Sequence, residues 1–179
     1  RIDHRLGNED FIAGKALDDR VGCFVLLELM KRITKPNADM YFVFTVQEEV
    51  GLYGAKVSAY QVDPDLAIAI DVTNANDINA EPTKIVGDGP VLTIKDDEMI
   101  GNACLNEWFK HWAKKLKIPI QLEVSNLGTT DALTISLSKG GVPSTSFGVC
   151  VRNIHTTHSI CSETDIARTI QILEQVCLH

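Results

Sequence analysis

The chain has 179 residues, of which 45% are hydrophobic and 23% are charged, and its formal net charge is −7 at pH 7. This length and composition are ordinary for a globular domain with a sizeable core. The acidic balance argues against nucleic acid and against an anionic membrane surface as partners. No apolar run approaches the roughly 20 residues that a membrane-spanning helix needs, so we expect no membrane insertion.

The cysteine pattern and the N-terminal segment indicate the cellular compartment of the protein. The cysteines are odd in number and include no C-x-x-C pair; they are Cys23, Cys104, Cys150, Cys161 and Cys177. We therefore expect buried free thiols in a cytoplasmic protein rather than a disulfide framework. The N-terminal segment RIDHRLGNED is neither a signal peptide nor a transit peptide, and it lacks an initiator methionine. We accordingly expect a fragment or a processed form of a longer protein.

Strand and helix patterns alternate along the chain, which predicts a layered α/β fold. Strands are expected at residues 11–17, 41–46, 66–71, 91–94, 118–124 and 143–150. Helices are expected at residues 21–33, 53–61, 102–116, 130–139 and 162–177. The polar segment 73–89 reads as irregular surface. No repeat or linker interrupts this pattern, so we expect one domain over residues 1–179.

Carboxylates and imidazoles follow four of the predicted strands. The residues are Asp18 and Asp19, Glu48 and Glu49, Asp71 and Asp77, and Arg152 with His155 and His158. In open α/β sheets, ligands bind beyond the carboxyl ends of the strands. Each group alone has an ordinary explanation, such as a helix cap, a turn or a surface loop. A divalent cation accounts for all four together, because carboxylate and imidazole are the ligands of zinc, cobalt and manganese.

The pair Glu48–Glu49 at the end of an apolar strand indicates two different roles. Two adjacent carboxylates repel each other unless a cation offsets their charge. One of them can ligate a metal, while the other stands beside it as a general base. A metal lowers the pKa of its bound water, and the base removes the proton as that water attacks a carbonyl.

Five segments together resemble the M42 family of metallo-aminopeptidases. They are GKALDDRVG (14–22), FTVQEEVGLYGA (44–55), PDLAIAIDVTNAND (64–77), GTTDA (128–132) and RNIHT (152–156). The family includes glutamyl and deblocking aminopeptidases, and some members carry an endoglucanase label. The segments run over nearly the whole chain in the family's order. The resemblance implies a three-layer α-β-α sandwich around a mixed, mostly parallel β-sheet, as in zinc peptidases.

The resemblance also implies a catalytic centre with two metal ions. Asp18 matches the carboxylate that bridges both metals, and it is preferred over Asp19 because family members can have Asn at the second position. Glu48 matches the general base. The resemblance further suggests that the Asp18–Asp19 peptide bond is cis.

The remaining ligands carry over to the other motifs. Glu49 matches a ligand of one metal, and Asp71 matches a ligand of the other. His155 matches the last ligand, with His158 as the alternative because HTTHS offers two histidines. Supporting or substrate-binding roles are expected for Asp19, Thr130, Asp131 and Arg152.

Two departures from the family pattern matter. The family has an N-terminal H-x-D histidine that ligates the metal paired with Asp71, whereas His4 here is followed by Arg5 and Leu6. The family's inserted β-rich dimerisation domain is also missing. We therefore expect one complete metal site, built from Asp18, Glu49 and His155, and a weakly active or inactive chain. The full-length protein is expected to form homo-oligomers.

Four functions compete on this sequence. The first is a two-metal aminopeptidase that acts on short peptides. The second is a glycoside hydrolase, which needs paired carboxylates but neither a metal nor His155. The third is another two-metal amidohydrolase, such as a deacylase, which shares the same machinery. The fourth is a non-catalytic assembly module, in which Glu48 has no role.

Overall fold

The computed structural model describes residues 4–5, 10–79 and 81–179, and its centre is a four-stranded sheet. The strands lie in the order β3 (Ala67–Asn74), β6 (Ser144–Val151), β4 (Val91–Lys95) and β5 (Gln121–Val124). β3 pairs with β6 in parallel and β4 with β5 in parallel, while β6 and β4 are antiparallel. The sheet is therefore mixed and mostly parallel, as predicted.

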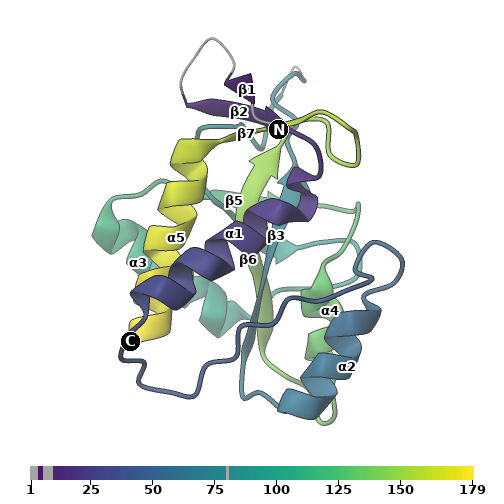
Figure 1. The fold of residues 1–179 in the computed structure, drawn as a ribbon, viewed down its shortest axis with the longest axis vertical. Coiled ribbons are helices and arrows are strands. Elements are labelled where there is room, and N and C mark those ends of the chain that lie inside the picture. The colour runs from purple at the N-terminus through teal and green to yellow at the C-terminus, as the bar shows by residue number, and fades with distance from the viewer. Residues whose placement is uncertain (1–3, 6–9, 80) are drawn as a thin grey trace.

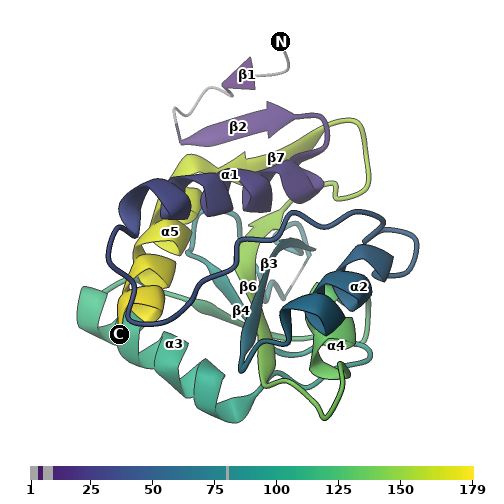
Figure 2. The same ribbon diagram turned by 60° about the horizontal axis from the view of Figure 1, so that its bottom comes forward.

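Helices cover both faces of this sheet (Figures 1 and 2). One face carries α1 (Leu17–Arg32), α3 (Ala103–Leu116) and α5 (Glu163–Leu178). The other face carries α2 (Tyr53–Val62) and α4 (Asp131–Ser136). The arrangement confirms the predicted three-layer sandwich.

The hydrophobic core lies on both faces of the four-stranded sheet. Phe147 of β6 meets Phe109 of α3, with ring centroids 4.5 Å apart, inside a large cluster beneath α1, α3 and α5. On the opposite face, Ala69 packs against Ala132 of α4. A sheet that is buried on both faces needs continuous apolar strands rather than alternating ones.

A second, antiparallel sheet holds the segment before α1 next to the loop that follows β6. It contains β1 (His4–Arg5), β2 (Phe11–Gly14) and β7 (Ser159–Ser162), in that order. Gly14 pairs with Ser159. The residues that lead into α1 therefore lie beside the loop that contains His155.

The segment 41–46, predicted as a strand, has no regular secondary structure and pairs with no strand in the described structure. A strand is completed by a partner within hydrogen-bonding distance, and local sequence cannot supply one. Here a cavity of about 1060 Å³ is lined both by this segment and by residues 66–71. The strand prediction was therefore wrong because the apolar pattern is present but the neighbouring strand is not.

Other differences from the prediction are small. Leu17 begins α1 rather than ending a strand, and α4 stops at Ser136. β1 and β7 were not predicted, because their two and four residues give little pattern. All five cysteines are free, but Cys23 and Cys104 are exposed, which corrects the expectation of burial for these two. None of the helices in the described residues is long and apolar enough to span a bilayer.

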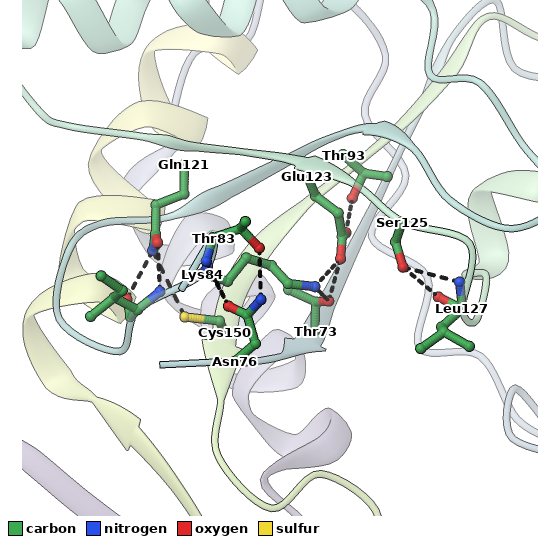
Figure 3. A network of polar contacts seen from close by, with 11 residues as sticks. Thr73, Asn76, Thr83, Lys84, Thr93, Gln121, Glu123, Ser125, Leu127 and Cys150 are labelled. Atoms are coloured by element: carbon green, nitrogen blue, oxygen red, sulfur yellow. Dashed lines mark hydrogen bonds and ion pairs between the residues drawn. The ribbon is translucent and has the colours of Figure 1, made fainter. Parts of the chain in front are cut away.

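A buried polar network supports the loop that follows β3 (Figure 3). Glu123 of β5 accepts hydrogen bonds from Thr73 Oγ1 at 2.6 Å and from Thr93 Oγ1 at 2.9 Å. The Lys84 ammonium pairs with the same carboxylate, so the buried charge is balanced. Asn76 accepts from the Lys84 amide at 2.7 Å. The network thus anchors the beginning and end of this loop to the sheet.

Candidate metal centre

Side chains from three separate segments converge at the carboxyl edge of the sheet. His155 Nε2 lies 3.2 Å from Asp18 Oδ2 and 3.3 Å from Glu49 Oε2. The ligand atoms of these three residues all lie within 4.8 Å of one another. Two carboxylates and one imidazole are a complete protein ligand set for a catalytic zinc ion with an open position. The residues therefore fit the divalent metal that the resemblance implies.

The start of α1 sets Asp18 and Asp19 apart. Both residues have non-helical backbone angles, and the peptide bond between them is cis, as the resemblance suggested. Asp18 turns to the His155 cluster, whereas Asp19 Oδ1 accepts the N–H of Gly22 at 2.8 Å. A Cβ on Gly22 would lie 2.7 Å from the backbone carbonyl oxygen of Ile70 as well as against the Asp19 carboxylate, so glycine is favoured there. Asp19 thus stabilises the first turn of α1, which orients the Asp18 side chain.

A tight turn presents the two adjacent glutamates. The Glu48 carbonyl accepts the N–H groups of Gly51 and Leu52, each at 3.0 Å. Gly51 has φ +138°, a conformation that favours glycine. Within this turn Glu49 is exposed and reaches His155, while Glu48 is half-buried. The structure therefore separates the directions of the two side chains, as their proposed roles require.

Asp71 lies on β3, deeper than the three-residue cluster. Its Oδ1 accepts the Val72 N–H at 2.7 Å. Burial raises its pKa well above the usual range, and the charges of Asp19 and Glu48 raise it further. Asp71 therefore shares the electrostatic field of the site without joining the Asp18–Glu49–His155 group.

The carboxyl groups of Asp18, Asp19 and Glu48 also have raised pKa values. Burial raises the pKa of Asp18 to about 6, and Glu49 adds to this shift. Burial also raises the pKa of Asp19 to about 7 and that of Glu48 to about 7. Clustered carboxylates of this kind hold protons unless a cation offsets their charge.

The loop after β6 selects His155 over His158 as the side chain in the cluster. Backbone hydrogen bonds between Arg152 and Ile160, at 2.9 and 3.1 Å, close the loop. His155 within it has φ +59° and points to Asp18 and Glu49. His158 Nδ1 instead contacts Thr157 Oγ1 at 2.9 Å. Sequence alone could not separate two histidines three residues apart.

Arg152 faces away from the cluster. Its Nε lies 2.9 Å from each carboxylate oxygen of Asp77, and its Nη2 lies 2.8 Å from Oδ2. This bond holds the pKa of Asp77 below its usual range. The ion pair ties the loop that presents His155 to the loop after β3, so the geometry favours support over substrate binding.

Thr130 and Asp131 begin α4 on the opposite side of the site. Thr130 caps the helix by accepting the Ala132 N–H at 3.4 Å. Asp131 Oδ2 accepts a hydrogen bond from Thr45 Oγ1 at 2.6 Å, and its buried Oδ1 has no hydrogen-bond partner in the described structure. Asp131 thereby tethers the segment that leads to Glu48, and its charge contributes to the raised pKa of Glu48.

Comparison with known proteins decides the family. The sequence matches the family model described as M42 glutamyl aminopeptidase over residues 3–172. The chain belongs to this family. The M42 chain is 39% identical over 171 residues to a putative aminopeptidase of Acetivibrio thermocellus, and the match covers 94% of the chain and 52% of that relative.

Solved structures agree with this assignment. An aminopeptidase from the archaeon Desulfurococcus kamchatkensis has a TM-score of 0.95 and 38% identity, over 99% of the M42 chain and 51% of that protein. The TET1 peptidase of Pyrococcus horikoshii, which can assemble into a tetrahedron or a large octahedral shell, has a TM-score of 0.86 and 29% identity, over 99% and 52% of the two chains. The M42 chain therefore spans about half the length of these relatives.

The sequence did not predict the side-chain partners of two site residues, Arg152 and Asp131. Asp77 was noted as a loop carboxylate, but its bond to Arg152 joins positions 75 residues apart. Thr45 lies in the segment predicted as a strand, and its hydroxyl donates to Asp131, 86 residues away. No local pattern in one sequence signals such long-range pairs.

Proposed function

We propose that this chain is the catalytic part of a metal-dependent aminopeptidase that hydrolyses the N-terminal peptide bond of short peptides. The observation that carries the proposal is the convergence of Asp18, Glu49 and His155 within 4.8 Å of one another. Family membership adds the reaction class, since the matching family model is described as a glutamyl aminopeptidase.

Each residue has a role that follows from its place. Asp18, Glu49 and His155 would hold one divalent cation, with zinc, cobalt and manganese as the candidates. When bound, such a cation polarises a carbonyl and lowers the pKa of water. Glu48 adjoins Glu49, and burial raises its pKa to about 7, which suits a general base at neutral pH. It takes the proton of the attacking water and returns it to the leaving amine.

Asp18 and Asp71 are the residues of this chain that would hold the family's second metal. Within this chain that position has two carboxylates and no histidine in an H-x-D context. Burial raises the pKa of the Asp71 carboxyl, so a cation held there would have to displace its proton. We therefore propose that the 179-residue chain binds at most one metal tightly and is weakly active or inactive by itself.

The wider setting is proposed on the same basis. Residues 1–179 form a single catalytic domain of a cytoplasmic protein, and the full-length protein assembles into homo-oligomers. The Pyrococcus horikoshii relative, which can assemble into a tetrahedron or a large octahedral shell, supports the oligomer. Neither nucleic acid nor a membrane is proposed as a partner, given the net charge of −7.

The competing functions have less support. A glycoside hydrolase needs carboxylates about 5–10 Å apart across a sugar ring, and an imidazole between them has no role. An assembly module leaves Glu48 without a task. A deacylase would use the same residues, so substrate profiling separates it from a peptidase.

The direct test is release of N-terminal residues from short peptides by a full-length form with zinc, cobalt or manganese. We expect chelation to stop release and metal to restore it. Absence of release with all three metals would contradict the proposal. Release that survives chelation, or turnover of a β-glucan after chelation, would also contradict it.

A further inference from the structure

The carboxylate proposed as the general base has no side chain that holds it. Among the described residues, none donates a hydrogen bond to the Glu48 carboxylate. Its position is therefore set by the backbone of the turn that presents it, and by the contacts that hold this turn. A misplacement of about 1 Å can cost roughly 100-fold in rate, so the support of the turn bears directly on catalysis.

The first residues of two helices hold this turn. Gly54 of α2 donates its N–H to the Val46 carbonyl at 3.0 Å. A Cβ on Gly54 would lie 2.4 Å from that carbonyl oxygen, so the close approach favours glycine. Thr45 Oγ1 donates to Asp131 Oδ2 at 2.6 Å, and Asp131 is the first residue of α4. The turn is thus attached to both α2 and α4, which lie side by side (Figures 1 and 2).

The Thr45 hydroxyl fixes the segment that enters the turn. Among the described residues, no backbone hydrogen bond joins residues 38–45 to another segment. Asn37 Nδ2 donates to the Leu178 carbonyl at 2.8 Å just before this segment, and Thr45 is bonded to Asp131 at its end. Because Thr45 lies three residues before the general base, a shift of Thr45 would be passed on to the turn.

Asp131 is itself fixed to the central sheet. The next residue, Ala132, is fully buried and packs against Ala69 of β3. Ala69 lies two residues before Asp71 on the same strand. The bond between Thr45 and Asp131 therefore ties the turn of the general base to the strand that carries a proposed metal ligand.

The carboxyl group of Asp131 is unfavourable for stability where it lies. Its Oδ1 is buried and has no hydrogen-bond partner in the described structure. Burial raises the pKa of Asp131, and the hydrogen bond from Thr45 opposes that shift. A buried acceptor without a partner destabilises a fold, and such groups in proteins call for an explanation. A role in holding the turn supplies one.

We propose that Thr45 and Asp131 form a positioning pair for the general base. Their hydrogen bond fixes the turn that presents Glu48 relative to β3, and neither side chain contacts the substrate. Of the two roles expected for Asp131, support and substrate binding, the geometry thus assigns support. The inference rests on the proposed function, because the base it positions belongs to that reaction. Loss of the bond slows the chemical step and leaves metal binding and substrate binding unchanged.

Steady-state kinetics of a full-length form with zinc tests the pair. Thr45→Val removes the hydroxyl at nearly constant volume and should lower kcat by roughly 10–100-fold. KM and the zinc affinity should both stay within about twofold of the parent values. Thr45→Ser keeps the hydroxyl and should hold kcat within roughly threefold of the parent. Unchanged kcat in Thr45→Val, or an equal loss in Thr45→Ser, would overturn the proposal.

Thr93→Val is the matched control for lost stability. Thr93 Oγ1 on β4 donates to the buried Glu123 carboxylate at 2.9 Å, so the same kind of bond is removed elsewhere in the fold. This variant should have a lower Tm but the kcat of the parent. A fall in kcat as large as that of Thr45→Val would make lost stability the cause and overturn the proposal.

Changes at Asp131 separate positioning from substrate binding. Asp131→Ala removes the acceptor and should lower kcat as far as Thr45→Val does. Because both changes break the same bond, the double variant should fall no further. Asp131→Asn keeps an acceptor oxygen without the charge and should retain most of kcat. A raised KM with preserved kcat in both Asp131 variants would assign this residue to substrate binding and overturn the proposal.

A readout without activity separates this inference from the proposed function. If the parent form releases no N-terminal residue, the proposed function fails, and the pair is tested by amide exchange in the 179-residue chain. The Gly54 amide, which donates to Val46, should then exchange roughly tenfold faster in Thr45→Val. The Asp63 amide, bonded to Ala59 at the other end of α2, should keep its rate. Faster exchange at Gly54 alone would support the pair as the restraint on the turn, and an unchanged rate would overturn it.

Discussion

The two halves of the candidate site handle negative charge differently. In the outer half, Asp18 and Glu49 lie 3.2 and 3.3 Å from the imidazole of His155, and both Glu49 and His155 are exposed. In the inner half, Glu48 is half-buried and Asp71 is buried more deeply, and burial is the chief cause of their raised pKa values, as it is for Asp18. The outer half therefore brings two carboxyl groups and an imidazole within reach of one cation, whereas the inner half adds two carboxyl groups whose protons a cation would have to displace.

The largest effect is expected from a change to Glu48, which should impair peptide hydrolysis while leaving metal binding by the outer half intact. Glu48→Gln should lower kcat for peptide hydrolysis by roughly 10²–10⁴-fold, because the amide cannot accept the proton of water. The metal affinity of the Asp18–Glu49–His155 site should stay nearly unchanged. Steady-state kinetics on a full-length form, paired with metal titration, measures both. Full activity in the Glu48→Gln variant would show that Glu48 is not the general base.

The next effect removes a ligand from the outer half. His155→Ala should weaken zinc binding by roughly 100-fold or more, which exceeds the 10–100-fold typical of losing a group that only orients a ligand. His158→Ala is the matched control and should bind zinc as the parent chain does. Calorimetric titration of both variants checks this. A larger loss in His158→Ala would transfer the ligand role to that residue.

A smaller effect is expected from the ion pair that holds the His155 loop. Arg152→Ala should weaken zinc binding by about tenfold, at the low end of the range for residues that orient a ligand. Arg32→Ala, at a surface ion pair with Glu28 and Glu174, serves as the control and should have no effect. If Arg152→Ala instead raised KM with no change in zinc affinity, a substrate-binding role would replace the supporting one.

The smallest effect concerns pH and the metal-free chain. The folded-state pKa values of Asp18, Asp19 and Glu48, about 6 to 7, exceed their ordinary values of 3.8 to 4.5. The folded state then binds more protons than the unfolded state between pH 4 and 7, so stability is highest at low pH and falls as pH rises through this window. We expect the Tm without metal to fall by a few degrees from pH 5 to pH 7.5.

Metal should reverse this pH trend. Zinc binds deprotonated ligands, so its stabilising effect grows as pH rises. Thermal unfolding with excess zinc should give a Tm that increases from pH 5 to pH 7.5. The Glu48→Gln variant, which lacks one titrating carboxyl group, should show a shallower decline without metal. A metal-free Tm that rises with pH would contradict the raised pKa values.

Sequence reasoning predicted most of the fold because helices and buried strands have local signatures. The apolar stripe of residues 102–116 and the run at 66–71 both became elements close to their expected bounds. The segment 41–46 failed because a strand depends on a partner from elsewhere in the fold. Local pattern therefore predicts the tendency to extend, and only the assembled sheet decides whether a strand forms.

For the site, the sequence predicted residue types and strand ends better than partners. The motif assigned Asp18, Glu49 and His155 to one metal, and the structure brings these three side chains together. The bonds of Arg152 to Asp77 and of Asp131 to Thr45 join distant positions, so spacing along the chain could not reveal them. The roles themselves await the variants above.

We propose that the outer half of the site has a complete set of protein ligands and that the inner half lacks one. Calorimetric titration of the metal-free 179-residue chain with zinc at neutral pH tests this most directly. We expect one tight zinc site per chain. The His155→Ala variant should lose this site, and the His158→Ala variant should keep it. Two tight sites per chain would contradict it, because the position between Asp18 and Asp71 would then need no further ligand.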